Sequence, residues 1–452
     1  MVEKTTSKSL SWYVFAAAIV CVPIDGFPYF PTESDHRPLS NLIVPLYLLI
    51  TKFEGKIHRY EKYLLTIFCI LWVFTLYKAF FVYGDYGGLI KFTVTGILAI
   101  TTIISCYTFL NKELVRSNFD FEVLMRSITS LLVISTILPI FFGLVQLLAI
   151  IGVVPLSFSE GLSLSLIYRF NSFDRLQFLN QEPFSASMYF IVVLLFYYFF
   201  AAKSFLKPSL VLLYILCVML TSSTAGFASL TLTLGISQLF FFTKKELKSF
   251  ALKIPFIVVS FYFIIELLYM FAGSYTLNKF STLASLFNGN LSYADILAVD
   301  FSIADRTFSP IIPFFSFSQT YGLGAGGESF KYIYSNVVYT HFPDLANNEF
   351  IRELLLSNEL TTPKILFSKL VGDFGLVGGG LFLYFIYYII SSLVEIKNRN
   401  FNSQMPKSMI VIFVFSIFNT QLCSYYNFTN IFLFTLATVF VSLNKKMVLH
   451  QK

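Results

Sequence analysis

Residues 184–202 read FSASMYFIVVLLFYYFFAA, an apolar stretch without a charged side chain. Because about 20 helical residues cross roughly 30 Å of hydrocarbon, a run of this length predicts a transmembrane helix. Backbone groups in lipid must be paired within their own segment, which favours the α-helix. Similar runs recur from end to end and predict twelve spans. Their approximate cores are residues 11–27, 38–52, 62–83, 88–110, 125–153, 184–202, 208–223, 225–243, 253–272, 365–393, 407–424 and 428–444.

The composition agrees with a membrane protein. Hydrophobic residues make up 56% of the chain, charged residues 13%, and the mean hydropathy is +0.73, values outside soluble globular usage. We therefore expect an all-α polytopic membrane protein in which residues 1–452 form a single integral membrane domain. No signal-peptide cleavage pattern follows the first apolar run, so we expect that run to be retained as a helix. All five cysteines lie in apolar segments, which argues against a disulfide framework or a metal cluster.

The distribution of Lys and Arg predicts the orientation, since cytoplasmic loops retain positive charge. With the N-terminus inside, 21 of the 32 Lys and Arg residues fall on the cytoplasmic face and 8 on the opposite face. Both termini are therefore predicted to be cytoplasmic, and residues 154–183 and 273–364 to form external loops. This asymmetry explains the net charge of +7 without nucleic acid as a partner.

The loop 273–364, between the ninth and tenth predicted spans, is the longest connection and carries Arg306, Gly322, Gly324 and His341. Long excursions of this kind usually carry function. The glycines match a dinucleotide-binding pattern, but that motif requires a βαβ unit, which is absent from the predicted context. We interpret the glycine run as a turn at which the backbone closely approaches a ligand or a neighbouring helix.

A second motif, Arg175–Phe184, ends the first external loop. Pro183 suits the first turn of a helix, and Glu182 would stand directly before it. The carboxylate would then be held at the membrane surface where the sixth span begins. A helix-entry cap beside a solvated Arg175 explains the motif equally well at this stage.

A third motif, Pro363–Gly378, is where the long loop re-enters the membrane, and its glycines permit close helix packing. Lys369 and Asp373 are four residues apart on one helical face, either as a neutralising pair or as part of a site. Lys78 and Lys91 lie near helix ends, where their ammonium groups can reach the interface.

In their order, these motifs resemble the O-antigen polymerase (Wzy-type) and O-antigen ligase superfamily. The resemblance covers the architecture of about twelve helices in a GT-C-like arrangement, with a large external loop between helices 9 and 10. The matching blocks are Arg175 with Glu182-Pro183, Ser222-Ser223-Thr224-Ala225-Gly226, Arg306 with Gly322 and Gly324, and Phe374-Gly375-Leu376-Val377-Gly378.

The resemblance implies a polymerase in the bacterial inner membrane. Such an enzyme transfers a growing glycan from undecaprenyl diphosphate to a sugar hydroxyl on the next lipid-linked repeat unit, on the periplasmic face. The expected partners are the lipid-linked oligosaccharide donor and acceptor, membrane lipid and a chain-length regulator protein, without nucleic acid. Transfer would be inverting and would need no metal or other cofactor.

Residue roles follow from this chemistry. Guanidinium groups bind diphosphate oxygens bidentately, so Arg175 and Arg306 are expected to stabilise the leaving group, with Lys364 as an auxiliary cation. Glu182 is the first candidate for the general base, and Asp373 and His341 are further candidates. Gly322 and Gly324 are expected to line the diphosphate and glycan site.

One departure separates the two enzyme classes. Ligases of the superfamily carry a histidine eleven residues before the glycine of the closing motif, and here Lys364 stands eleven residues before Gly375. A cation is kept but an imidazole is not, which favours a polymerase over a ligase. A lipid-linked oligosaccharide flippase or transporter is the non-enzymatic alternative. The lopsided layout and the scarcity of charges in the predicted spans count against it.

Overall fold

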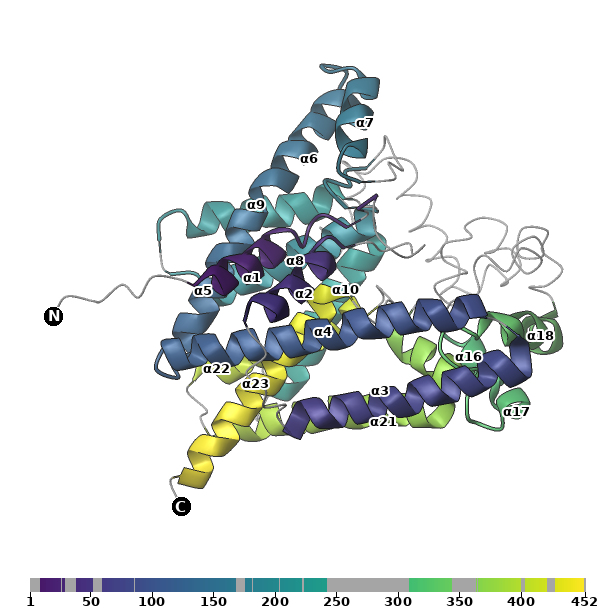
Figure 1. Ribbon diagram of the computed structural model, residues 1–452. Coiled ribbons are helices and arrows are strands. Elements are labelled where there is room, and N and C mark those ends of the chain that lie inside the picture. The colour runs from purple at the N-terminus through teal and green to yellow at the C-terminus, as the bar shows by residue number, and fades with distance from the viewer. Residues whose placement is uncertain are drawn as a thin grey trace.

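The computed structural model describes residues 9–25, 27–28, 38–51, 59–84, 86–167, 175–180, 182–202, 204–221, 223–241, 309–343, 363, 365–399, 403–420 and 427–450. These residues form helices and connecting turns without a strand, apart from isolated bridges of Asp25 with Pro38 and Asn180. The helices are α1 (Leu10–Val20), α2 (Ser40–Ile50), α3 (Arg59–Lys78), the π-helix η1 (Ala79–Tyr83), α4 (Tyr86–Arg116), α5 (Phe121–Ser135), α6 (Ile137–Ile150), α7 (Leu156–Leu164), α8 (Pro183–Phe200), α9 (Lys207–Leu220), α10 (Thr224–Phe241), α16 (Ile312–Phe315), α17 (Phe317–Thr320), α18 (Lys331–His341), α21 (Leu366–Arg399), α22 (Gln404–Asn419) and α23 (Phe428–His450) (Figure 1).

Within the described residues, six segments are long and apolar enough to cross a membrane. They are Lys62–Tyr83, Tyr86–Arg116, Phe121–Ile150, Pro183–Phe200, Leu366–Arg399 and Phe428–Lys445. The all-helical class is confirmed, and these spans agree with a polytopic membrane protein. Five of the predicted spans coincide with shorter apolar helices, α1, α2, α9, α10 and α22. The predicted span 253–272 lies outside the described residues, so the total of twelve stays a prediction.

The predicted fifth span is divided into two consecutive helices. Its two parts, α5 and α6, meet at Thr136. Pro139 lacks an N–H group and its ring crowds the carbonyl of Ser135 four residues earlier, which interrupts an α-helix at this point. α6 projects beyond the other helices, with α7 next to its outer end (Figure 1).

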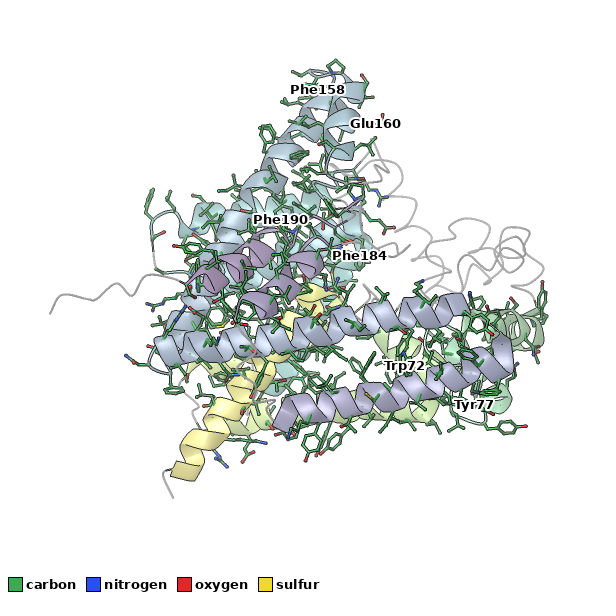
Figure 2. All side chains as sticks on the ribbon, in the orientation of Figure 1. Trp72, Tyr77, Phe158, Glu160, Phe184 and Phe190 are labelled. Carbon is green, nitrogen blue, oxygen red and sulfur yellow. The ribbon has the colours of Figure 1, made fainter. Side chains whose placement is uncertain are left out.

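α8 occupies the centre of the bundle. It is apolar on all sides, and 89% of its spanning window is buried, as expected for a core helix. α5, α9, α10 and α22 surround it. Phe190, fully buried, packs edge-on against Phe178 with ring centroids 4.7 Å apart, and Figure 2 shows it within the bundle.

α3 lies at the edge of the bundle, and only 11% of its spanning window is buried. It is tied to α4 by Trp72, whose indole N–H donates to Thr93 Oγ1 over 2.9 Å. Its outer side chains, among them Tyr77, point away from the protein (Figure 2). An exposed apolar face of this kind suits contact with lipid.

Where the sequence predicts two helix ends on the same side of the membrane, the structure shows contacts between them. At the predicted cytoplasmic ends, Lys397 Nζ at the end of α21 donates to the Phe240 carbonyl at the end of α10 over 2.8 Å. At the predicted external ends, the Leu366 N–H at the start of α21 donates to the Thr420 carbonyl after α22 over 3.1 Å. Helices α16, α17 and α18 lie on the side of the view away from both termini (Figure 1). These contacts fit the predicted alternation, and which face is external stays a prediction.

Candidate functional site

The glycine-rich turn of the long predicted loop, residues 321–328, sits directly on helix α21. The Leu376 N–H donates to the Gly322 carbonyl over 2.9 Å, and the Gly326 N–H donates to the Asp373 carbonyl over 2.7 Å. A third hydrogen bond, 2.9 Å long, joins the Ala325 N–H to the Gly372 carbonyl. Of the two partners that the sequence left open for this turn, a neighbouring helix is the one observed.

Two glycines make this approach sterically feasible. At Gly324 a β-carbon would lie 2.5 Å from the Asp373 carbonyl oxygen, closer than real side chains come. Gly375 has φ +59° and ψ −145°, a kink inside α21, and this conformation is close to one that only glycine adopts readily. A β-carbon at Gly375 would collide with the Gly322 carbonyl oxygen. The turn and the kink are therefore complementary.

α3 and α4 hold the other side of the turn. The Gly327 N–H donates to Thr75 Oγ1 of α3 over 2.9 Å. A β-carbon at Gly327 would lie 2.3 to 2.7 Å from the ring of Phe92 of α4, so the backbone at Gly327 is closely packed against that ring. Residues 321–328 are thus fixed between α21 and the pair α3 and α4, which lies far earlier in the sequence.

The turn ends at Glu328, whose buried carboxylate lies between two lysines. Glu328 Oε1 is 2.9 Å from Lys369 Nζ, and Glu328 Oε2 is 3.3 Å from Lys91 Nζ. Lys369 Nζ is also 3.8 Å from Asp373 Oδ2, and the Glu328 N–H donates to that same oxygen over 3.3 Å. We call Lys91, Glu328, Lys369 and Asp373 the charge cluster.

Each charged side chain of the charge cluster lies next to an opposite charge within the cluster. The side chains of Lys369, Asp373 and Glu328 are 4%, 1% and 8% exposed, so their charges need partners. Burial by itself raises the pKa of Glu328, but the attraction of Lys369 and then Lys91 outweighs it, and the pKa is lowered below its ordinary value of 4.5. Two cations and two carboxylates balance, and Lys91, whose side chain is 40% exposed, is the member open to a ligand.

The first motif begins α8 as the sequence predicts. Glu182 is the N-cap residue, Pro183 is the first helical residue, and the Glu182 side chain makes no capping hydrogen bond. Its carboxylate is therefore not used in closing the helix end. The half-buried Arg175 precedes Leu176, whose N–H donates to the Leu220 carbonyl at the end of α9 over 3.2 Å.

The small-polar motif packs against α8 just after this first motif. A β-carbon at Gly226 would collide with the Ser187 hydroxyl, one turn into α8. Ser223 Oγ accepts the Gly226 N–H over 3.2 Å, which fixes the start of α10. Ser222 lies outside the described residues.

The remaining predicted site residues are placed as follows. His341 is the last residue of α18 and is exposed, with its ring 5.3 Å from the ring of Phe315. Arg306 and Lys364 lie outside the described residues. The structure thus brings Gly322, Gly324 and Asp373 together and places His341 at the end of a separate helix.

Glu328 and Lys91 are members of the charge cluster that the sequence did not mark as site residues. Lys91 was expected to reach the interface, which stays a prediction, and its ammonium group also pairs with Glu328. The available signal was an acid directly after Gly326-Gly327, within a long loop facing a membrane-re-entry motif that carries a lysine. The sequence around Glu328 does not identify which distant lysine or arginine its carboxylate will contact.

The described residues contain no group of three or more His, Cys, Asp or Glu side chains placed to hold a metal ion. No protein-family model, curated protein or solved structure matches the chain. The site is therefore interpreted from its own residues.

Proposed function

We propose that this protein polymerises undecaprenyl diphosphate-linked repeat units of a bacterial surface glycan, as a metal-independent, inverting glycosyltransferase acting on the external face of the inner membrane. The observation that carries the proposal is the pairing of the motifs. The glycine turn of the second block is docked on the closing block through Gly324 and Gly375. Helix α8, which begins at the first block, is packed against the small-polar block through Ser187 and Gly226.

This pairing supports a shared site because each block is remote from its partner in the sequence. The Leu366–Thr420 hydrogen bond ties the start of α21 to the end of α22, and α22 packs against α8 and α10. The two pairs of blocks are therefore linked through α22 within one bundle. A site assembled from several elements is typical of a catalytic centre supported by a rigid scaffold.

The proposed chemistry is a single displacement. The acceptor hydroxyl attacks the anomeric carbon of the donor, a glycosidic bond forms, and the bond from that carbon to the diphosphate oxygen breaks. Arg175 and Arg306 stabilise the departing diphosphate, with Lys364 as a further cation. Glu182 takes the hydroxyl proton, since its carboxylate is free of a capping role.

The charge cluster positions the loop in this proposal. Lys91 and Lys369 are already paired with carboxylates, so their first role is to fix the glycine turn and the loop that carries Arg306. Asp373, which the sequence offered as a base, is 1% exposed and lies beside Lys369. We therefore place Glu182 ahead of Asp373 as the base.

The test is complementation of a deletion strain with Arg306→Ala at normal expression. We expect the long polysaccharide ladder to collapse to core plus a single repeat unit on a gel. Arg126→Ala, which removes an exposed arginine at the predicted cytoplasmic end, is the matched control and should leave the ladder unchanged. A normal ladder in the Arg306 variant contradicts the proposal.

Two other outcomes identify other functions. Polymer that accumulates on undecaprenyl diphosphate while the lipid A-core stays unsubstituted indicates the ligase alternative. Repeat units trapped on the cytoplasmic side of the membrane indicate a flippase.

A further inference from the structure

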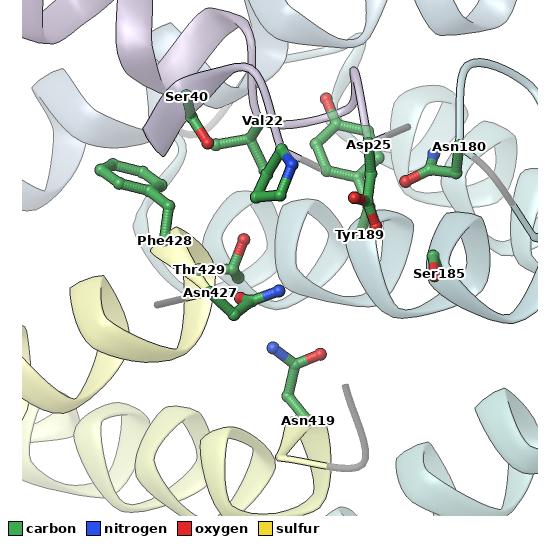
Figure 3. A pocket seen from close by; sticks show the side chains of 11 residues that line it. Val22, Asp25, Ser40, Asn180, Ser185, Tyr189, Asn419, Asn427, Phe428 and Thr429 are labelled. Atoms are coloured by element: carbon green, nitrogen blue, oxygen red, sulfur yellow. The ribbon is translucent and has the colours of Figure 1, made fainter. Parts of the chain in front are cut away.

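A small polar pocket lies among the helix ends at which α1 and α22 finish and α2, α8 and α23 begin (Figure 3). Three segments meet there through the backbone, because Asp25 bridges to both Pro38 and Asn180. Asn180 is two residues before Glu182, and Asn419 is next to Thr420, which accepts the first hydrogen bond from α21. The pocket is thus next to the first motif and to the start of the closing motif.

Several lining atoms of the pocket have no hydrogen-bond partner in the described part of the protein. They are Ser40 Oγ, Asn180 Nδ2, Ser185 Oγ and Asn419 Oδ1, on side chains of residues that are 1%, 2%, 3% and 1% exposed. Buried polar atoms without partners destabilise a fold, so they are rare unless something binds them. Seven such atoms occur in the described residues and four of them line this pocket. Their concentration indicates a binding site.

The kind of lining group decides the kind of ligand. Amides, hydroxyls and one carboxylate, that of Asp25, surround the pocket, and none of its described lining residues is a cation. Such a set suits a neutral group that both donates and accepts hydrogen bonds, as a hydroxyl does, and not an anion. A metal cation would require oxygen from every side, whereas Asn180 presents Nδ2.

The size of the pocket limits which chemical groups could bind in it. Its volume of about 20 Å³ is close to that of one water-sized group. A whole sugar ring does not enter, but a single ring hydroxyl does.

We propose that this pocket binds one hydroxyl group of an uncharged sugar residue in the lipid-linked repeat unit. The hydroxyl donates its single proton to the Asp25 carboxylate, and its oxygen accepts from Asn180 Nδ2 and the Ser185 hydroxyl. The inference rests on the proposed function, since it deepens the substrate recognition of the same site. It makes the pocket a specificity subsite beside Glu182.

The experiment uses the full-length protein in detergent or nanodiscs. The probe is the repeat-unit oligosaccharide released from the surface polymer of the producing strain, and binding is measured by calorimetry or saturation-transfer NMR. The test variants are Ser185→Ala and Asp25→Asn. Ser229→Ala is the matched control, because Ser229 Oγ is also buried and without a partner among the described residues but does not line the pocket.

We expect Ser185→Ala to weaken binding about fivefold, Asp25→Asn about tenfold or more, and Ser229→Ala less than about twofold. Without the oligosaccharide, Ser185→Ala should melt no lower than the wild type, because it removes an unpaired hydroxyl. A merely structural role for Ser185 would lower the melting temperature and leave affinity unchanged.

Three results overturn the inference. The first is equal affinity of all variants for the oligosaccharide. The second is no binding to the wild type, which indicates that the pocket holds a trapped water only. The third is stabilisation of the protein by sodium that Asp25→Asn abolishes. The ladder assay separates this failure from failure of the proposed function. Loss of the ladder in Arg306→Ala with unchanged binding in Ser185→Ala rejects the subsite alone. A normal ladder in Arg306→Ala with binding lost in Ser185→Ala rejects polymerisation and retains a sugar site.

Discussion

Lys369 Nζ lies 2.9 Å from Glu328 Oε1, and this buried ion pair joins the long predicted loop to helix α21. The two residues come from the two motifs that meet at Gly324 and Gly375. Because both side chains are almost fully buried, each depends on the other for its charge to be tolerated. The stability of the loop should therefore respond strongly to either partner.

Glu328→Gln should destabilise the protein by about 3–5 kcal/mol, because it leaves Lys369 without its nearest carboxylate in a buried site. The measurement is the melting temperature of purified protein. Glu122→Gln is the control, since it breaks the pair with Arg126, in which both side chains are more than half exposed, and such pairs contribute about 0–1 kcal/mol. Equal melting temperatures for the two glutamine variants would contradict a stabilising charge cluster.

The charge cluster also predicts sensitivity to acid. The pKa of Glu328 in the folded protein is below 4.5, its ordinary value, so the stabilisation is fully present above pH 4.5. It is lost as the pH falls below 4.5 through the folded pKa, because the folded protein must then take up a proton against the attraction of the lysines. Melting temperatures of the wild type and of Glu328→Gln should thus converge on acidification. A difference that stays constant down to pH 3 or widens would refute the assignment.

Gly375→Ala should disrupt the docking of the glycine turn, since its β-carbon meets the Gly322 carbonyl oxygen in a positive-φ conformation. We expect a lower melting temperature and a shortened or absent ladder. Gly380→Ala, in the same helix and with nothing within 4 Å of the added carbon, is the matched control. It should be neutral or stabilising by up to about 1 kcal/mol, as alanine is the better helix former. Similar effects from both substitutions would show that the kink has no special role.

Glu182→Gln should abolish polymer formation while leaving the melting temperature unchanged, because the Glu182 side chain makes no capping hydrogen bond. The opposite behaviour is expected of Asp120→Ala at the start of α5. There the carboxylate accepts from the N–H groups of Glu122 and Val123 over 2.8 and 3.2 Å, and loss of such a cap costs about 1 kcal/mol. Gel ladders and thermal melts of the two variants give the comparison. A full ladder in Glu182→Gln would exclude Glu182 as the base.

Local features of the fold could be predicted from the sequence. Apolar length identified most helices, and Pro183 after Glu182 marked the start of α8. The break at Thr136 was not predicted, because a hydropathy window averages over Pro139 and finds one continuous apolar run. Whether a segment is helical, and where the helix begins, depends on residues adjacent in the sequence, so these features can be read from it.

The charge cluster could be predicted only in part. Lys369 and Asp373 are one helical turn apart, so their proximity follows from helix geometry. Glu328 meets Lys91 and Lys369 across three separate elements, and such contacts depend on how helices pack. The same reason hid the polar pocket, whose atoms come from five helix ends that no local spacing connects.

The kink at Gly375 changes where the lipid-crossing rod of α21 begins. Leu376–Val394, the apolar part after the kink, extends about 28 Å at 1.5 Å per residue, which is close to a hydrocarbon thickness of about 30 Å. We therefore expect the two turns before the kink to lie at the level of the headgroups. Lys369 and Asp373 lie in those turns, so their ionisation does not require charge to be stored in hydrocarbon.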